Sequence, residues 1–120
     1  MSSIICIGDF GTGSYDQECV SNLMNELILQ NNTKLIIGLG DNIYPDGVES
    51  VHDSQFYHKF AKIYNNLPPK IKFYNCLGNH DYHGKVSSQI KYTYSTKNKN
   101  QRWVLPYNYY SFGKIFGNKK

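Results

Sequence analysis

Three short polar motifs in this sequence carry residue types that could bind metal ions. The motifs are Gly8-Asp9-Phe10-Gly11, Gly40-Asp41-Asn42-Ile43-Tyr44 and Gly78-Asn79-His80-Asp81. Each follows directly on an apolar run, and its glycine lets the backbone turn sharply and approach an ion closely. Two carboxylates at one point repel each other unless a cation neutralises them. Carboxylate, amide and phenol oxygens suit a hard cation such as ferric iron, and added imidazole suits Zn²⁺, Mn²⁺ or Fe²⁺.

The apolar runs before these motifs predict the strands that position them. Strands are expected over residues 4–7, 35–39 and 71–77, each closed by a glycine. Helices are expected over residues 16–31 and 54–65, the first with Asp16 as its N-cap. The apolar face of the first helix should consist of Val20, Leu23, Met24, Leu27 and Ile28. A short helix over residues 86–94 and an extended aromatic segment over 103–112 complete the prediction.

This alternation of elements predicts an α/β fold, a βαβαβ unit with parallel strands joined by right-handed crossovers. In open sheets of this class the ligand lies beyond the carboxyl ends of the strands. Asp9, Asp41 and Asn79 should therefore project into one crevice. Each motif alone is weak evidence, because an aspartate after a strand is often only a loop cap. The three motifs together, each at a strand end, favour a metal site.

Composition limits the remaining choices. The 120 residues, 40% of them hydrophobic, predict one domain over 1–120 with a buried core. No apolar run is long enough for a transmembrane helix, and the N-terminus lacks the features of a signal peptide. The three cysteines have no CxxC spacing, which predicts buried free thiols and favours a reducing, intracellular compartment. All nine acidic residues lie at or before Asp81, and the basic stretch that follows lacks a nucleic-acid-binding signature.

The three motifs, in this order, resemble those of the calcineurin-like metallophosphoesterases. Two details resemble the purple acid phosphatases within that superfamily. Gly11 stands where many relatives carry a metal-binding histidine, and Tyr44 stands where this branch carries an iron-binding tyrosine. Residues 40–48, 86–90 and 102–106 also look like the small, tartrate-resistant type. The resemblance implies a four-layer α/β/β/α sandwich, of which this chain supplies the N-terminal part, truncated to roughly one sheet and its helices.

The resemblance also implies a metal-binding role for individual residues. Asp9 and Tyr44 would bind a first metal ion, typically Fe³⁺, and Asp41 would bridge two ions. Asn79 would bind the second ion, typically Fe²⁺, Zn²⁺ or Mn²⁺. Two such ions clamp a phosphate group and lower the pKa of a bound water molecule.

Catalytic roles fall to two residues of the third motif. The resemblance implies that His80 contacts the phosphate or the leaving group and that Asp81 orients a neighbouring group. His83 lies near the expected crevice. Three roles remain open for it: a replacement metal ligand, a contact to the phosphate, or a loop residue that faces the solvent. His52 and His58 lie in a loop and on the second expected helix, where neither has a reason to face the metal ions.

Relatives of this kind supply three further histidines, from a lone-histidine motif and a Gly-His-x-His motif, beyond the length of this chain. We therefore expect an incomplete metal site, a raised pKa for one carboxyl group of the Asp9–Asp41 pair, and an open apolar sheet face. Three hypotheses remain. The chain is a truncated acid-phosphatase-like protein with weak or no activity, an active enzyme completed by self-association or by a separate C-terminal half, or a non-catalytic metal-binding, phosphate-binding or interaction protein. The substrate of an active form would be a small phosphate ester or a phosphoprotein, and we expect neither nucleic acid nor membrane as partner.

Overall fold

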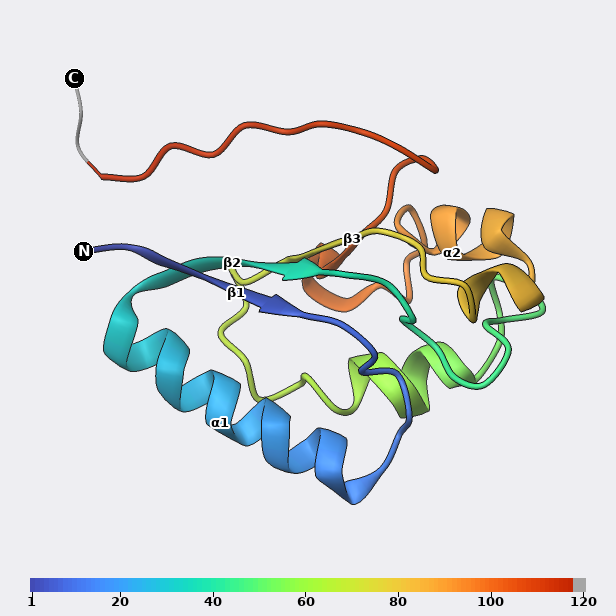
Figure 1. Ribbon diagram of the computed structural model, residues 1–120, viewed down its shortest axis with the longest axis horizontal. Coiled ribbons are helices and arrows are strands. Elements are labelled where there is room, and N and C mark those ends of the chain that lie inside the picture. Colours follow the sequence, from blue (N-terminus) through green and yellow to red (C-terminus); the bar gives the residue numbers. More distant parts are fainter. Residues whose placement is uncertain (118–120) are drawn as a thin grey trace.

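A computed structural model describes residues 1–117, which form a four-stranded parallel sheet with helices (Figure 1). The strands lie in the order β1 (Ser3–Ile7), β2 (Thr33–Gly38), β3 (Phe73–Asn75) and β4 (Trp103–Val104). The side chains of Ile36, Phe73 and Trp103 are in register across the sheet and fully buried. The predicted α/β fold with parallel strands is confirmed.

Two strands are much shorter than predicted. β3 is shorter than residues 71–77, although the Cys76 N–H still donates to the Gly38 carbonyl at 3.0 Å. In the expected extended segment over 103–112, only the two residues of β4 join the ladder. Pro106 lies just beyond β4 and has no backbone N–H with which to continue such a ladder.

Helix α1 (Tyr15–Asn31) begins earlier than predicted. Its N-cap is Ser14, not Asp16, because the Ser14 side chain accepts a hydrogen bond from the Gln17 N–H at 3.3 Å. Asn32 ends the helix in the left-handed conformation, with φ of 50°.

The buried face of α1 was only partly predicted. Met24 and Ile28 are buried, but their neighbours on this face are Gln17 and Ser21. Gln17 donates to the Lys59 carbonyl at 2.9 Å, and the Ser21 hydroxyl donates to the Ile63 carbonyl at 2.8 Å. The helix is thereby rotated, so the predicted core residues Val20, Leu23 and Leu27 are exposed at 43%, 54% and 37%.

The second expected helix is a π-helix over Tyr57–Ala61, flanked by turns, rather than a regular helix over 54–65. Phe60 of the π-helix and Ile63 in the turn that follows it are both buried. Later in the chain come a 3₁₀ helix (Asp81–His83), α2 (Val86–Tyr92) and a second 3₁₀ helix (Lys99–Gln101). Helix α2 ends slightly earlier than predicted.

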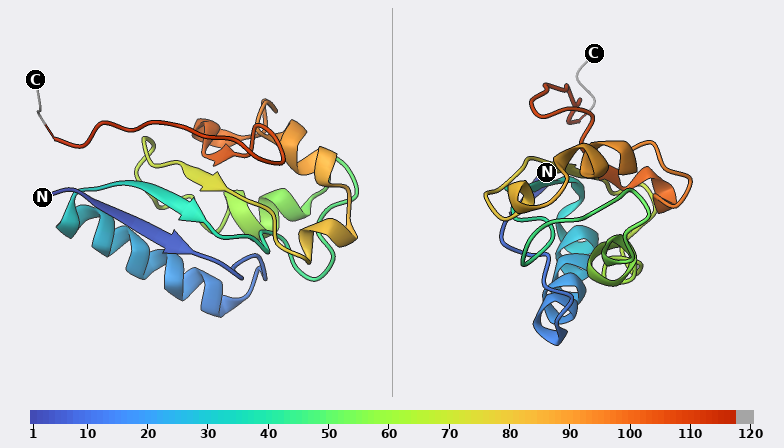
Figure 2. Two further views of the ribbon diagram at one scale, coloured as in Figure 1. Left: turned by 45° about the horizontal axis from the view of Figure 1, so that its top comes forward. Right: turned by 90° about the vertical axis from the view of Figure 1, so that its right-hand side faces the viewer.

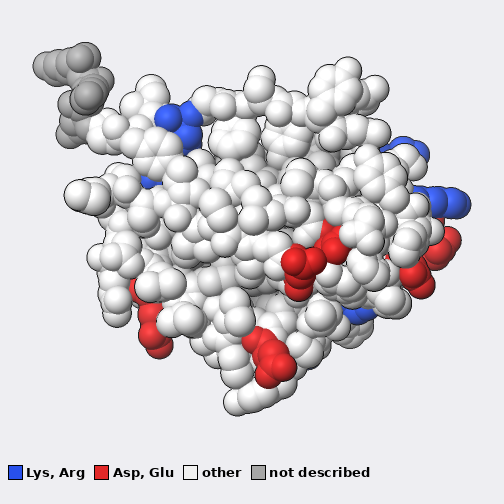
Figure 3. Space-filling model, viewed as in Figure 1, with Lys and Arg blue, Asp and Glu red and all other residues white. Residues whose placement is uncertain are grey.

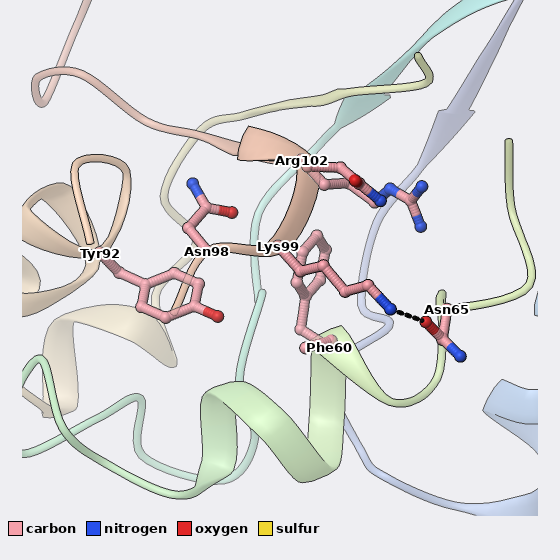
Figure 4. A pocket seen from close by; sticks show the side chains of 8 residues that line it. Phe60, Asn65, Tyr92, Asn98, Lys99 and Arg102 are labelled. Carbon is pink, nitrogen blue, oxygen red and sulfur yellow. Dashed lines mark hydrogen bonds between the residues drawn. The ribbon is translucent and has the colours of Figure 1, made fainter. Parts of the chain in front are cut away.

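An aromatic cluster forms the core between the sheet and these helices. Phe56 stacks on Tyr92 with ring centroids 3.9 Å apart, and Phe60 packs edge-on against Trp103 and Phe73. Beside it lies a hollow of about 10 Å³, room for one water molecule at most (Figure 4).

Arg102, at the edge of that hollow, has a structural role. Its buried guanidinium donates to the carbonyl groups of Tyr64, Leu67, Pro68 and Ile71. These bonds fix the connection between the π-helix and β3. Burial lowers the pKa of Arg102.

Among residues 1–117, the C-terminal segment is what covers the second face of the sheet. Helix α1 and the π-helix lie on one face, whereas residues 107–117 cross the other in an extended conformation (Figures 1 and 2). Phe112 stacks on Tyr74 of β3 at 4.0 Å, and Leu39 stays 58% exposed. The expectation of an open sheet face is therefore wrong in part, because residues 107–117 cross this face, although Leu39, just beyond β2, remains exposed.

The cysteines correct another expectation. All three are free, as predicted, but all three are exposed rather than buried. Cys6 lies on the outermost strand, Cys19 on the outer side of α1, and Cys76 just beyond β3. No helix among residues 1–117 combines the length and the apolar character that crossing a membrane requires.

Candidate metal centre

The carboxyl ends of β1 and β2 lead to Asp9 and Asp41, which share an unusual backbone conformation. Both residues have φ of 53°, in the left-handed region that residues other than glycine rarely adopt. Holding such a residue costs on the order of 1 kcal/mol or more, and strain of this kind is concentrated at functional sites. The structure thus maintains the same local strain at the ends of two neighbouring strands.

Backbone hydrogen bonds hold the first two motifs together. The Asp9 N–H donates to the Gly40 carbonyl at 3.1 Å, and the Tyr44 N–H donates to the Gly11 carbonyl at 2.8 Å. Gly11 is in such close contact that an added Cβ would lie 1.8 Å from the Asn42 carbonyl oxygen. A side chain at position 11 is therefore excluded on packing grounds alone.

The Tyr44 hydroxyl lies between the two aspartates. It donates to Asp9 Oδ1 at 2.8 Å and to Asp41 Oδ2 at 2.9 Å. Oxygen atoms of three predicted ligands thus meet at one point, although the residues lie up to 35 positions apart.

These contacts determine how the site titrates. Desolvation acts to raise the pKa of Asp41, but hydrogen bonds from the Tyr44 hydroxyl and the His80 N–H outweigh it, and the pKa is lowered. Desolvation and the hydrogen bonds to Asp9 and Asp41 raise the pKa of Tyr44 well above its usual value. The expectation that repulsion would raise the pKa of a carboxyl group in this pair is therefore wrong for Asp41.

The third motif reaches the same point from β3. The His80 N–H donates to Asp41 Oδ1 at 3.0 Å. A Cβ added to Gly78 would lie 2.1 Å from the same oxygen. Asn79, which is exposed, is thus flanked on both sides by residues in contact with Asp41.

Asp81 lies behind the crevice rather than in it. It is fully buried and accepts hydrogen bonds from the N–H groups of Asn42, Ile43 and Gly78 at 2.9–3.3 Å. Its carboxyl group therefore ties the second motif to the third through their backbones. We predicted that Asp81 would orient a neighbouring group; what it orients is the peptide backbone, so it is a positioning residue.

Gln89 of α2 is a positioning residue that the sequence analysis missed. Its side chain donates to Asp81 Oδ1 at 2.9 Å and accepts from the Asn42 amide at 3.3 Å. Its backbone carbonyl accepts the Trp103 indole N–H at 3.1 Å. The available signal was a polar residue at a buried position of a short helix. Only the fold shows what this residue contacts.

The two histidines after β3 are anchored by neighbouring residues of one loop. His80 Nδ1 lies 2.6 Å from the Pro45 carbonyl, which can only accept, so Nδ1 carries a proton. His83 Nδ1 lies 3.1 Å from Asp46 Oδ1, and the two imidazole centroids are 5.3 Å apart. His83 is thus next to His80.

Asp9, Asp41 and Tyr44 fit a hard cation. One hydroxyl proton serves two carboxyl oxygens here, and a cation at the same point would be bound by both carboxylates and the phenolate. Among residues 1–117, no three histidine, cysteine, aspartate or glutamate side chains gather as a metal-binding group. His52 lies beside the π-helix and His58 within it, as expected from the sequence.

Comparisons with known proteins identify the family of this chain. A family model described as calcineurin-like phosphoesterase matches residues 2–119. Purple acid phosphatase 7 of Arabidopsis thaliana is 34% identical over 84% of this chain and 30% of its own length. Purple acid phosphatase 3 of the same plant is 39% identical over 73% of this chain and 24% of its length. Human tartrate-resistant acid phosphatase type 5 is 37% identical over 62% of this chain and 22% of its length.

A solved structure shares the fold. GAP50, the anchor in the inner membrane complex of Plasmodium, superposes with a TM-score of 0.78 at 20% identity, over 89% of this chain and 34% of its own. The chain thus spans less than a third of the curated relatives named above. On the family match, which covers nearly every residue, the chain belongs to the calcineurin-like phosphoesterase family.

Proposed function

We propose that this chain supplies the N-terminal ligands of a dinuclear metal centre that hydrolyses phosphate monoesters, as an acid phosphatase does. Asp9 and Tyr44 hold a first ion, for which their oxygen donors favour Fe³⁺. Asp41 would contribute to both ions, and Asn79 would contribute to the second, Fe²⁺, Zn²⁺ or Mn²⁺. When bound, two such ions polarise the phosphate and activate a water molecule.

The remaining residues of the site hold and position the reacting groups. His80 carries a proton on Nδ1 for the Pro45 carbonyl, which leaves Nε2 to contact the phosphate or the leaving group. Asp81 and Gln89 keep the loops that carry Asp41 and Asn79 at a constant spacing. The substrate would be a phosphate ester, either a small molecule or a phosphoprotein.

One observation supports this proposal above all others. The Tyr44 hydroxyl touches both aspartates, so three oxygen donors from two strand ends meet at one point. A structural loop cap would require only one of these carboxyl groups. Maintaining two strained aspartates around a phenol is the arrangement expected of a cation site.

Metal content and turnover test the proposal together. Purified chain is loaded with Fe³⁺ and Zn²⁺, its bound metal is measured, and p-nitrophenyl phosphate is offered as substrate. We expect bound metal and weak turnover, both lost in Asp41→Asn and both kept in the control Glu26→Gln, whose carboxyl group lies on the exposed side of α1. Equal metal content in wild type and Asp41→Asn would refute the assignment.

A non-catalytic metal-binding role is the second candidate. In this proposal the second ion draws on Asp41 and Asn79, a small ligand set for a catalytic ion, and no three histidine, cysteine, aspartate or glutamate side chains gather among residues 1–117. Bound metal without turnover, again dependent on Asp41, would favour this role. Turnover that rises steeply with protein concentration would instead favour a site completed by self-association.

A further inference from the structure

Lys59 of the π-helix differs from most charged residues of this chain. Most of the others lie at the surface, and those in the view of Figure 3 are scattered rather than clustered. Lys59 is partly buried, and its ammonium group donates to the Tyr44 carbonyl and, at 2.7 Å, to Gln55 Oε1. The charge of Lys59 is therefore held against the backbone of a candidate metal ligand.

Residues 44–47 form the loop that Lys59 contacts, called the tyrosine loop below. Lys59 donates to its first carbonyl group, that of Tyr44, and Gln55 Nε2 donates to its last, that of Gly47, at 3.1 Å. Because Gln55 also accepts from the Lys59 ammonium group, the two side chains act as one unit. The π-helix and the turn before it thus hold the tyrosine loop at both ends.

The rest of Lys59 is held by the segment that follows β1. Its backbone carbonyl accepts from Gln17 Nε2 of α1 at 2.9 Å. Its side-chain stem lies against Gly13, where an added Cβ would come within 3.0 Å of Lys59 Cγ. Lys59 therefore connects the loop that carries Asp9 to the loop that carries Tyr44.

We propose that Lys59 is a positioning residue of the candidate metal centre, which keeps the Tyr44 phenol in contact with the two aspartates. The inference rests on the proposed function, because it concerns the same site. The phenol meets both carboxyl groups, at 2.8 and 2.9 Å, only while the backbone of Tyr44 stays in place. Removing a group that holds a metal ligand in place typically weakens metal binding 10–100-fold.

A stable loop does not require this contact. A carbonyl group in a surface loop can accept from water, whereas ordering a lysine side chain costs conformational entropy. The helix type supports a functional role as well, because single π-helical turns often occur at functional sites. Lys62, just after the π-helix, shows the usual state of a lysine, since its side chain is exposed.

The same contact should act on His80. His80 Nδ1 donates to the Pro45 carbonyl, which is the next one along the tyrosine loop. The centroid of the His80 ring also lies 4.6 Å from that of the Tyr44 ring. A shift of the tyrosine loop would therefore move both rings, with or without a bound ion.

Titration with ferric iron, followed by the tyrosinate–iron band, tests the proposal. Lys59→Met keeps an apolar stem but removes the donor, so it should bind iron about 10–100-fold more weakly. Its band should still appear at saturation, because Tyr44 remains. Lys59→Arg keeps a charged donor and should bind iron more tightly than Lys59→Met, and the matched control Lys62→Met should bind like wild type.

Far-ultraviolet circular dichroism shows whether each variant is folded during the titration. An iron affinity of folded Lys59→Met within about threefold of wild type would overturn the proposal, whatever its stability in urea. An equal loss of affinity in Lys62→Met would overturn it too.

Nuclear magnetic resonance of the metal-free chain gives a readout that does not depend on iron. The ring signals of Tyr44 and His80, identified by their loss in Tyr44→Phe and His80→Gln, should move in Lys59→Met and stay in place in Lys62→Met. Unmoved signals in Lys59→Met would overturn the proposal. If wild type develops no iron band but these signals move, the proposed function fails and the positioning role of Lys59 stands.

A measurement on wild type covers the case in which Lys59→Met does not fold. The ammonium protons of Lys59, which are hydrogen-bonded, should exchange with water more slowly than those of the exposed Lys62. Equal exchange at the two lysines would overturn the proposal.

Discussion

Replacing Asp81 by alanine should destabilise the fold far more than a typical aspartate substitution. The carboxyl group is fully buried and accepts hydrogen bonds from the backbones of Asn42, Ile43 and Gly78 and from the Gln89 side chain. Without it, several buried donors lose their partners at about 1–3 kcal/mol each, partly relieved by water entering the space. We expect a loss of about 4 kcal/mol, a large share of the roughly 5–15 kcal/mol by which domains are stable.

Urea unfolding at neutral pH, followed by far-ultraviolet circular dichroism, measures this loss. Asp46→Ala is the matched control, because Asp46 is exposed and its side chain bonds, among residues 1–117, to His83 alone. The free energy of unfolding of this variant should change by less than about 1 kcal/mol. A loss of less than about 1 kcal/mol in Asp81→Ala as well would contradict the view that this carboxyl group ties the second motif to the third.

Three further substitutions test other parts of the structure. Gly11→Ala should destabilise the chain by more than about 2 kcal/mol in urea unfolding, because the added Cβ would overlap the Asn42 carbonyl. Near-wild-type stability of this variant would contradict the observed loop packing. Arg102→Met should lower the free energy of unfolding by about 2–4 kcal/mol. Arg102→Lys should lower it less, because lysine replaces only some of the donors to the four carbonyl groups. Equal losses in the two variants would show that the planar guanidinium is not required. Desolvation acts to raise the pKa of Asp53, but hydrogen bonds from the Glu49 and Gln55 N–H groups outweigh it, and the pKa is lowered. The ionised Asp53 therefore stabilises the folded chain above a pH of about 4, and this contribution is lost as the pH falls below that value. Asp53→Ala should therefore cost about 1 kcal/mol at neutral pH and little at acid pH, and a pH-independent loss in thermal melts would refute this account.

The strands and their polar ends could be predicted because local signals determine them. An apolar run closed by glycine specifies both a buried strand and the sharp turn after it, which places Asp9 and Asp41 at one edge of the sheet. The left-handed conformation of both aspartates follows from tertiary hydrogen bonds between the loops, which no single motif reveals.

The orientation of α1 could not be predicted from hydrophobic periodicity. Gln17 and Ser21 are buried because their polar groups find carbonyl partners at Lys59 of the π-helix and at Ile63 just after it, more than 40 residues away in the sequence. The same rotation exposes Val20, Leu23 and Leu27 beside β1. Gln89 escaped prediction for a similar reason, since its partners lie on loops distant in sequence.

The most direct test of the central claim is the visible absorption spectrum during titration with ferric iron. If Asp9, Asp41 and Tyr44 bind one ion, wild-type chain should develop a tyrosinate–iron band that saturates at one equivalent, and Tyr44→Phe should develop none. A band of equal strength in Tyr44→Phe, or none in wild type, would contradict the assignment of this site.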